Sequence, residues 1–174
     1  MKILISISHS VEKVFNYIQC SMRNLILIVI FSTVSFLTLA DDRGFTHYKK
    51  GEFNKALKIW TEEADNGEAN AIYNIGLLYF FGNGVNKDLS IAYNYCKRAA
   101  LKGLARAQNN LAYMYLNGMG TDKDYVKSYA WSLIAIKQGY NSQGIKDNAK
   151  INLTPAMLID AERLANEMIK EIMK

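Results

Sequence analysis

A duplication within residues 71–139 constrains the fold of this chain more than any other feature of its sequence. Two successive segments match position by position at a constant offset of 36 residues. The matched pairs include Ala71 with Ala107, Tyr79 with Tyr115, Gly84 with Gly120, Asp88 with Asp124 and Gly103 with Gly139. Self-similarity at a fixed period of this length is typical of stacked helical pairs. The sequence therefore predicts a repeat architecture.

The first part of each copy has the periodicity of a buried helix. Its apolar positions recur every four residues, at Ala71, Ile75 and Tyr79 and again at Ala107, Leu111 and Tyr115. Residues at this spacing share one helical face, which we expect to lie in the core. Gly76 and Ala112 occupy one register within this face. A minimal side chain there lets a neighbouring helix approach closely.

A Gly-x-Gly sequence follows the first helix in both copies. The glycines are Gly82 and Gly84, then Gly118 and Gly120. Glycine adopts positive φ freely and often ends helices, so this sequence predicts the end of the first helix. Asp88 and Asp124 come next, where a carboxylate can accept hydrogen bonds from the N–H groups that begin a second helix. Each copy is predicted to fold as helix, loop and helix.

The combined pattern resembles a known repeat. It reads Ala-x3-(Leu/Ile)-(Gly/Ala)-x2-Tyr-x2-Gly-x-Gly-x3-Asp, followed by small and aromatic residues. Over residues 71–139 it resembles the Sel1-like repeat, a relative of the tetratricopeptide repeat. The resemblance implies an all-α fold, a right-handed α-solenoid of stacked antiparallel helix pairs with a C-terminal capping helix. With the leader described below, the chain is similar to the exported bacterial type of this family.

The remainder of the chain is divided around the two copies, which we place at residues 68–103 and 104–139. Residues 41–67 are predicted to form a shorter unit of tetratricopeptide type, because they lack the Gly-x-Gly loop. Residues 140–174 are predicted to form a degenerate repeat and then a capping helix. Thr154 and Pro155 suit the N-cap and the first turn of that helix. Terminal repeats of a solenoid need such caps.

A candidate signal peptide precedes the repeats. Arg23 is followed by an apolar run at residues 25–39 and then by Ala40, the pattern of a secretory signal. We expect residues 22–40 to be removed and the mature protein to be periplasmic or secreted, with no membrane span. The run would extend only about 22 Å as a helix, against a hydrocarbon core of about 30 Å. The alternative is that residues 25–39 remain as an inner-membrane anchor.

Residues 1–21 fit a signal peptide poorly, because they place a long and partly polar segment before the charged Arg23. We interpret them as an N-terminal extension or as a misassigned start, with Met22 as the first residue of the protein.

The charge balance does not indicate a nucleic-acid partner. The net charge is +5, but residues 41–174 hold 18 basic and 15 acidic side chains in an interspersed order. Solvated helix faces explain such a distribution better than a basic patch does. Two cysteines occur, Cys20 in the leader region and Cys96 in a predicted second helix. Cys96 is expected to be a small buried thiol.

Candidate catalytic and metal-binding residues are scarce. His9 and His47 are the only histidines, and zinc sites need three or four ligands. The sequence has no Gly-x-Ser-x-Gly motif for a nucleophile, and its Gly-x-Gly loops lack the Gly-Lys-(Ser/Thr) ending of a phosphate-binding loop. We therefore expect no metal, no cofactor and no enzymatic activity.

A concave surface lined by the first helices is the expected binding site, since solenoids generally bind partners there. Analogy with the tetratricopeptide register gives five candidates, Asn70, Tyr73, Arg106, Asn109 and Tyr113. Asparagine can bond an extended backbone, arginine a carboxylate, and tyrosine offers flat contact area. The apolar positions of the same register, Leu77, Phe80 and Leu116, are expected to pack against neighbouring helices instead.

These observations favour a non-enzymatic protein–protein interaction module, an adaptor or scaffold in the bacterial cell envelope that binds a partner segment in its groove. A second hypothesis is a secreted factor that acts on host cells. A third is an envelope hydrolase or drug-binding protein, as in cysteine-rich relatives of the family. The missing cysteines and the lack of an acid–base pair argue against the third.

Overall fold

The structure is a computed structural model that describes residues 43–172. The expected signal peptide, its cleavage after Ala40 and the alternative membrane anchor fall outside the described residues. Helices α3 to α9 and the candidate binding surface lie in the compact unit that begins at Thr46. In the described part of the chain, none of the helices combines the length and hydrophobicity that crossing a membrane requires.

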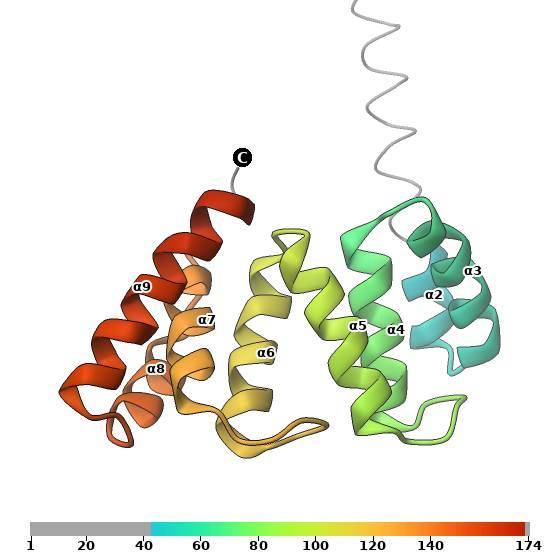
Figure 1. The fold of residues 1–174 in the computed structure, drawn as a ribbon. Helices are drawn as coiled ribbons and strands as arrows, with labels where there is room; N and C mark the ends of the chain where they lie inside the picture. Colours follow the sequence, from blue (N-terminus) through green and yellow to red (C-terminus); the bar gives the residue numbers. More distant parts are fainter. Residues whose placement is uncertain (1–42, 173–174) are drawn as a thin grey trace, which may run out of the picture. The chain divides into compact units, whose positions relative to one another are not determined.

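All regular structure between residues 43 and 172 is helical, which confirms the predicted fold class. The helices are α2 (Arg43–Lys49), α3 (Phe53–Asp65), α4 (Ala69–Phe81), α5 (Leu89–Leu101), α6 (Ala105–Asn117), α7 (Tyr125–Lys137), α8 (Gln143–Lys150) and α9 (Pro155–Ile172). From α3 onward, each helix packs against the next as far as α8, and α9 returns to pack against α7 (Figure 1). The repeated sequences form the α4–α5 pair and the α6–α7 pair.

The predicted caps form at both second helices. The carboxylate of Asp88 accepts a hydrogen bond from the backbone N–H of Ile91 at 2.9 Å. Asp124 accepts the equivalent bond from Lys127, also at 2.9 Å. Each bond satisfies one of the N–H groups that the first helical turn leaves without an internal partner. Asp88 and Asp124 therefore cap the first turns of α5 and α7, respectively.

Glycine ends both first helices. Gly82 and Gly118 stand after α4 and α6 in the left-handed conformation, with φ of 76° and 71°. This conformation is strained for any residue with a Cβ atom. At the other end of the chain, the hydroxyl of Thr154 accepts a hydrogen bond from the N–H of Met157 at 3.3 Å, as expected for the cap of α9.

The core follows the predicted register. The repeated positions Ala71, Ile75 and Leu111 are at most 2% exposed, and Trp60 of α3 is 3% exposed. Gly76 permits the close approach of α5, because a Cβ atom there would lie 3.0 Å from the Cβ of Tyr95. Small and branched apolar residues thus bring the helices of each pair together.

The last helices close the stack. Ala161 and Ala165 of α9 are buried. Leu164 and Met168 of the same helix are partly buried and pack against the core. Polar residues of α8, including Asp147, are exposed at this end. These positions agree with the predicted capping helix.

Candidate binding surface between α4 and α6

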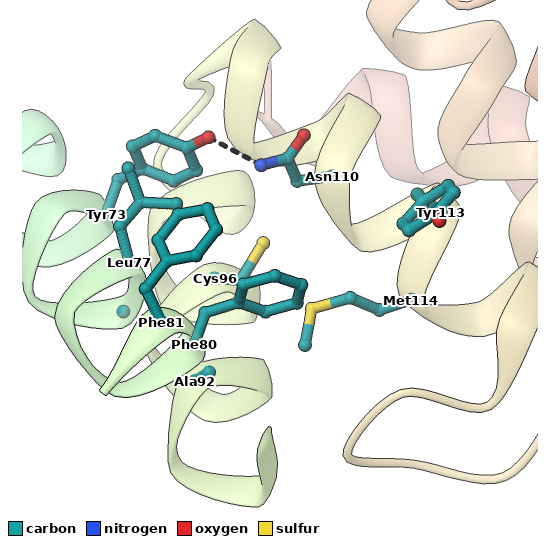
Figure 2. Close-up of a pocket in the computed structure, with 10 residues that line it drawn as sticks. Tyr73, Leu77, Phe80, Phe81, Ala92, Cys96, Asn110, Tyr113 and Met114 are labelled. Carbon is teal, nitrogen blue, oxygen red and sulfur yellow. Dashed lines mark hydrogen bonds between the residues drawn. The ribbon is translucent and has the colours of Figure 1, made fainter. Parts of the chain in front are cut away.

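A pocket of about 190 Å³ lies between α4 and α6, and α5 closes its inner end (Figure 2). It is lined by Tyr73, Gly76, Leu77, Phe80, Phe81, Ala92, Cys96, Asn110, Tyr113 and Met114. The α4 residues recur three and four positions apart, at 73, then 76 and 77, then 80 and 81, which places them on one side of that helix. A cavity of roughly 150 Å³ accepts benzene, and sites for drug-sized ligands start at roughly 300 Å³. The pocket therefore has room for one large side chain.

Aromatic side chains form the mouth of the pocket. The rings of Phe80 and Phe81 meet edge to face, with centroids 5.0 Å apart. Phe81 is 58% exposed, and Tyr113 on the opposite side is 43% exposed. Exposed apolar residues matter when they gather around a hollow, because such patches mark binding sites on soluble proteins. Here they surround the pocket.

The inner end of the pocket is apolar and chemically inert. Cys96 is 5% exposed, and its thiol lies 3.3 Å from the carbonyl oxygen of Ala107. Burial raises the pKa of Cys96 to about 12. The thiolate is the reactive form, and this thiol is protonated at neutral pH. The expectation of a small buried thiol is confirmed.

A hydrogen bond between repeats borders the pocket. The side-chain amide of Asn110 donates to the hydroxyl of Tyr73 at 2.5 Å (Figure 2). Tyr73 is 8% exposed, and burial raises its pKa to about 12, with the nearby Cys96 acting in the same direction and Arg106 opposing it. The phenol is therefore neutral at physiological pH and holds α4 to α6.

Arg106 lies beside this bond. Its guanidinium carbon is 5.1 Å from the centroid of the Tyr73 ring, and its Nη2 donates to the side-chain oxygen of Asn70 at 2.5 Å. Its Nε is buried without a hydrogen-bond partner. No carboxylate in residues 43–172 forms an ion pair with it. The guanidinium is therefore positioned by a ring and an amide, with its charge uncompensated.

Asn109 is the neighbouring group on the same helix face. Its side-chain oxygen is buried without a hydrogen-bond partner, and its side-chain nitrogen makes only a long bond of 3.4 Å to Asn110. Arg106 and Asn109 are three positions apart, so their side chains are neighbours on α6. This helix thus carries an unused donor and an unused acceptor next to the pocket.

The structure brings the five sequence-derived candidates close to this pocket. Tyr73 and Tyr113 line it, whereas Asn70 and Arg106 form the adjoining polar cluster with Asn109 next along the helix. Leu77 and Phe80 pack against the core as expected, and they also line the pocket. Leu116 packs in a separate cluster around Tyr129. Binding by the five candidates stays a prediction.

Six lining residues were absent from the sequence-based groove positions, namely Gly76, Phe81, Ala92, Cys96, Asn110 and Met114. For two of them a signal existed, because Asn110 and Met114 follow Arg106 at intervals of four along α6. The same signal existed for Phe81, the last residue of α4, because it follows Tyr73 and Leu77 at intervals of four. Among the residues that the structure describes, no group of three histidine, cysteine or acidic side chains could hold a metal ion.

Comparisons with known proteins agree with this architecture. Residues 69–104 and 105–140 each match the sequence profile of the Sel1 repeat. A stretch of 68 residues is 34% identical to part of HRD3A, an ERAD-associated E3 ubiquitin-protein ligase component of Arabidopsis thaliana. That match covers 38% of this chain but only 10% of the plant protein.

Two solved structures are similar in fold. One is c5321, a protective antigen present in uropathogenic Escherichia coli strains displaying an SLR fold, with a TM-score of 0.72 and 29% identity over 78% of this chain and 30% of the antigen. The other is a Sel1 repeat protein from Oxalobacter formigenes, with a TM-score of 0.53 and 28% identity over 57% of this chain and 43% of that protein. The predicted solenoid of stacked helix pairs is confirmed.

Proposed function

Since the chain is a protein of the Sel1-like repeat family, we propose that it is a non-enzymatic interaction module that binds a partner protein segment between α4 and α6. Sel1 repeats generally mediate protein–protein interaction, and the family is typically non-catalytic. One observation carries the proposal. An apolar pocket with exposed aromatic residues at its mouth adjoins the unused hydrogen-bonding groups of Arg106 and Asn109.

The remaining chemistry of the described residues supports a binding role. His47 is the only histidine between residues 43 and 172, and its Nδ1 lies 2.5 Å from a carboxylate oxygen of Glu52. Cys96 is a buried thiol whose raised pKa keeps it protonated. Neither residue is accompanied by the nucleophile, base and orienting group that covalent catalysis needs.

The site of action is proposed to be the cell envelope or the exterior. The leader pattern at residues 22–40 supports export. Likeness to a protective antigen of uropathogenic bacteria supports, as a second candidate, a secreted factor acting on host cells. The intact mass of the protein from fractionated native cells tests export, because cleavage gives a chain that begins at Asp41. Recovery from the culture medium rather than the periplasm would favour the secreted factor.

Site-specific photocrosslinking tests the proposed binding surface. A benzophenone amino acid replaces Phe81, which is exposed at the mouth of the pocket, in the full chain expressed in its native cells. The matched control places it at Ile159 of α9, which is 67% exposed and does not line the pocket. We expect a discrete protein adduct from position 81 alone, and we expect Tyr113→Asp to abolish it. Identical adducts from both positions, or adducts indifferent to Tyr113→Asp, would contradict the proposal.

A further inference from the structure

We infer that the surface between α4 and α6 selects extended segments that insert a bulky apolar side chain into the pocket and place an aspartate or glutamate, two residues away, beside Arg106. This inference rests on the proposed function, and it states the chemistry of the partner segment. It follows from the volume and lining of the pocket, from the uncompensated charge of Arg106, and from the spacing of residues along α6.

The pocket requires an apolar anchor. Side chains of Leu77, Phe80 and Met114 form its walls, and Ala92 and Cys96 close its inner end. No charged residue lines it. A charge or an unpaired polar group buried there would lose its hydration without compensation. Methionine adapts its shape to an irregular partner. Phenylalanine, leucine, methionine and tryptophan therefore suit a pocket of about 190 Å³.

Arg106 requires an acidic neighbour. Among residues 43–172, no carboxylate forms an ion pair with Arg106. Asn70 accepts from one guanidinium nitrogen, whereas the buried Nε has no acceptor. An unsatisfied buried donor is unfavourable, and a carboxylate can accept two parallel bonds from a guanidinium. A partner carboxylate would thus compensate the charge of the Arg106 guanidinium.

The spacing follows from helix and strand geometry. Arg106 and Asn110 lie on successive turns of α6, so their positions are about 6 Å apart along the helix axis. Two residues of an extended chain advance by about 6.6 Å, and side chains two apart point to the same side. An anchor that enters the pocket beside Asn110 is therefore separated from the carboxylate by one residue.

Selection from random peptides tests this inference. A phage-displayed library of twelve-residue peptides is panned on the full chain. We expect the enriched sequences to carry a bulky apolar residue two positions from aspartate or glutamate, in either order. A soluble consensus peptide and its amide analogue, with the acid changed to asparagine or glutamine, are then titrated against the protein and its variants.

Two arginine variants separate charge recognition from general effects. Arg106→Gln should weaken the acidic peptide at least tenfold and leave the amide analogue unchanged. Arg98→Gln is the matched control, because Arg98 also lies over a tyrosine ring, with its guanidinium carbon 5.3 Å from the Tyr95 centroid, but does not line the pocket. It should bind both peptides like the wild type. Thermal melting verifies that each variant is folded.

The possible outcomes are distinguishable. Enriched peptides that share an apolar anchor but no acid, or equal weakening of both peptides by Arg106→Gln, would overturn the inference and leave the proposed function standing. An absence of enriched peptides, or peptide binding indifferent to Tyr113→Asp, would overturn both.

Discussion

In the α4–α5 pair, Ala92 and Cys96 of the second helix border the pocket, whereas the same register of the α6–α7 pair holds Ser128 and Ser132. Both serines are fully buried. Ser128 donates to the carbonyl oxygen of Ala112 at 2.9 Å, and Ser132 donates to that of Ser128 at 2.7 Å. The two pairs share the same arrangement of helices, so the side chains at these positions determine whether the second helix borders a pocket or forms internal hydrogen bonds.

The helix that follows each pair differs as well. The α4–α5 pair is followed by α6, which has 13 residues and supplies Asn110, Tyr113 and Met114 to the pocket. The α6–α7 pair is followed by α8, which has only 8 residues and carries mostly polar side chains. A complete neighbouring helix is thus what turns the groove beside α4 into a walled pocket.

The largest expected difference in stability is between substitutions of two glycines with positive φ, Gly120 and Gly139. Gly120 has a φ of 71°, and a Cβ atom there would overlap the carbonyl oxygen of Leu89. Gly139 also has a positive φ, of 82°, but nothing lies within 4 Å of its Cβ position. We expect Gly120→Ala to lower the free energy of unfolding by about 4 kcal/mol, and Gly139→Ala by about 1.5 kcal/mol, the strain of the backbone alone. Urea denaturation measures both, and equal losses would show that the contact with Leu89 is unimportant.

The small-residue register of the first helices gives the next largest effect. Gly76→Ala places a Cβ atom 3.0 Å from the Cβ of Tyr95 and 3.3 Å from the carbonyl oxygen of Ala92. Overpacking of 1–3 kcal/mol outweighs the helix propensity gained, so we expect a net loss of about 1 to 2 kcal/mol. The reciprocal change Ala112→Gly should cost about 1 kcal/mol from propensity and lost burial. A stabilised Gly76→Ala protein would show that α5 can move away.

Tyr79 and Tyr115 share a register but not a partner. The hydroxyl of Tyr115 lies 2.7 Å from that of Tyr93, whereas the ring of Tyr79 stacks on Tyr95 with centroids 6.0 Å apart. Tyr115→Phe removes a half-buried hydrogen bond, which should lower stability by about 1 kcal/mol. Tyr79→Phe should stay within about 0.5 kcal/mol of the wild type. Thermal unfolding of both variants would contradict this contrast if the two losses were equal.

The smallest expected effect concerns the charge of an N-cap. Desolvation tends to raise the pKa of Asp124, but hydrogen bonds from the backbone and side chain of Lys127 outweigh it and lower the pKa. A carboxyl whose pKa is lower in the folded state stabilises the protein above its unfolded pKa of about 3.9 and loses this effect as the pH falls further. Asp124→Asn keeps a capping side chain, so we expect a loss below about 1 kcal/mol at pH 7. Urea denaturation at pH 7 and pH 3 should show that this difference is smaller in acid; a constant difference would refute its electrostatic origin.

The framework could be predicted because each of its features depends on one local requirement. Positive φ at Gly82, an acceptor at Asp88 and a buried stripe through Ile75 are all readable from the spacing of residue types. The pocket could be predicted only in part. Its walls come from separate helices, and the reach of Phe81 and Met114 depends on how α4 and α6 approach each other. That distance follows from packing across α5, which no local pattern specifies.

The second glycine of each Gly-x-Gly loop has a role that the sequence did not predict. Gly82 ends α4 as predicted, whereas Gly84 packs against α3, in the preceding helix pair. A Cβ atom at Gly84 would lie 2.5 Å from that of Phe53, the first residue of α3. The corresponding glycine, Gly120, meets Leu89, the first residue of α5.

Because both members of this contact advance by 36 residues, duplication of one such segment copies the protruding loop together with the surface that receives it. A lineage could lengthen or shorten the protein by whole segments without evolving a new contact. At the next position in the series, residues 154–156, the chain has Thr-Pro-Ala in place of Gly-x-Gly. Thr154 and Pro155 begin α9 in place of a protruding loop, so the series of loop contacts does not continue at this position.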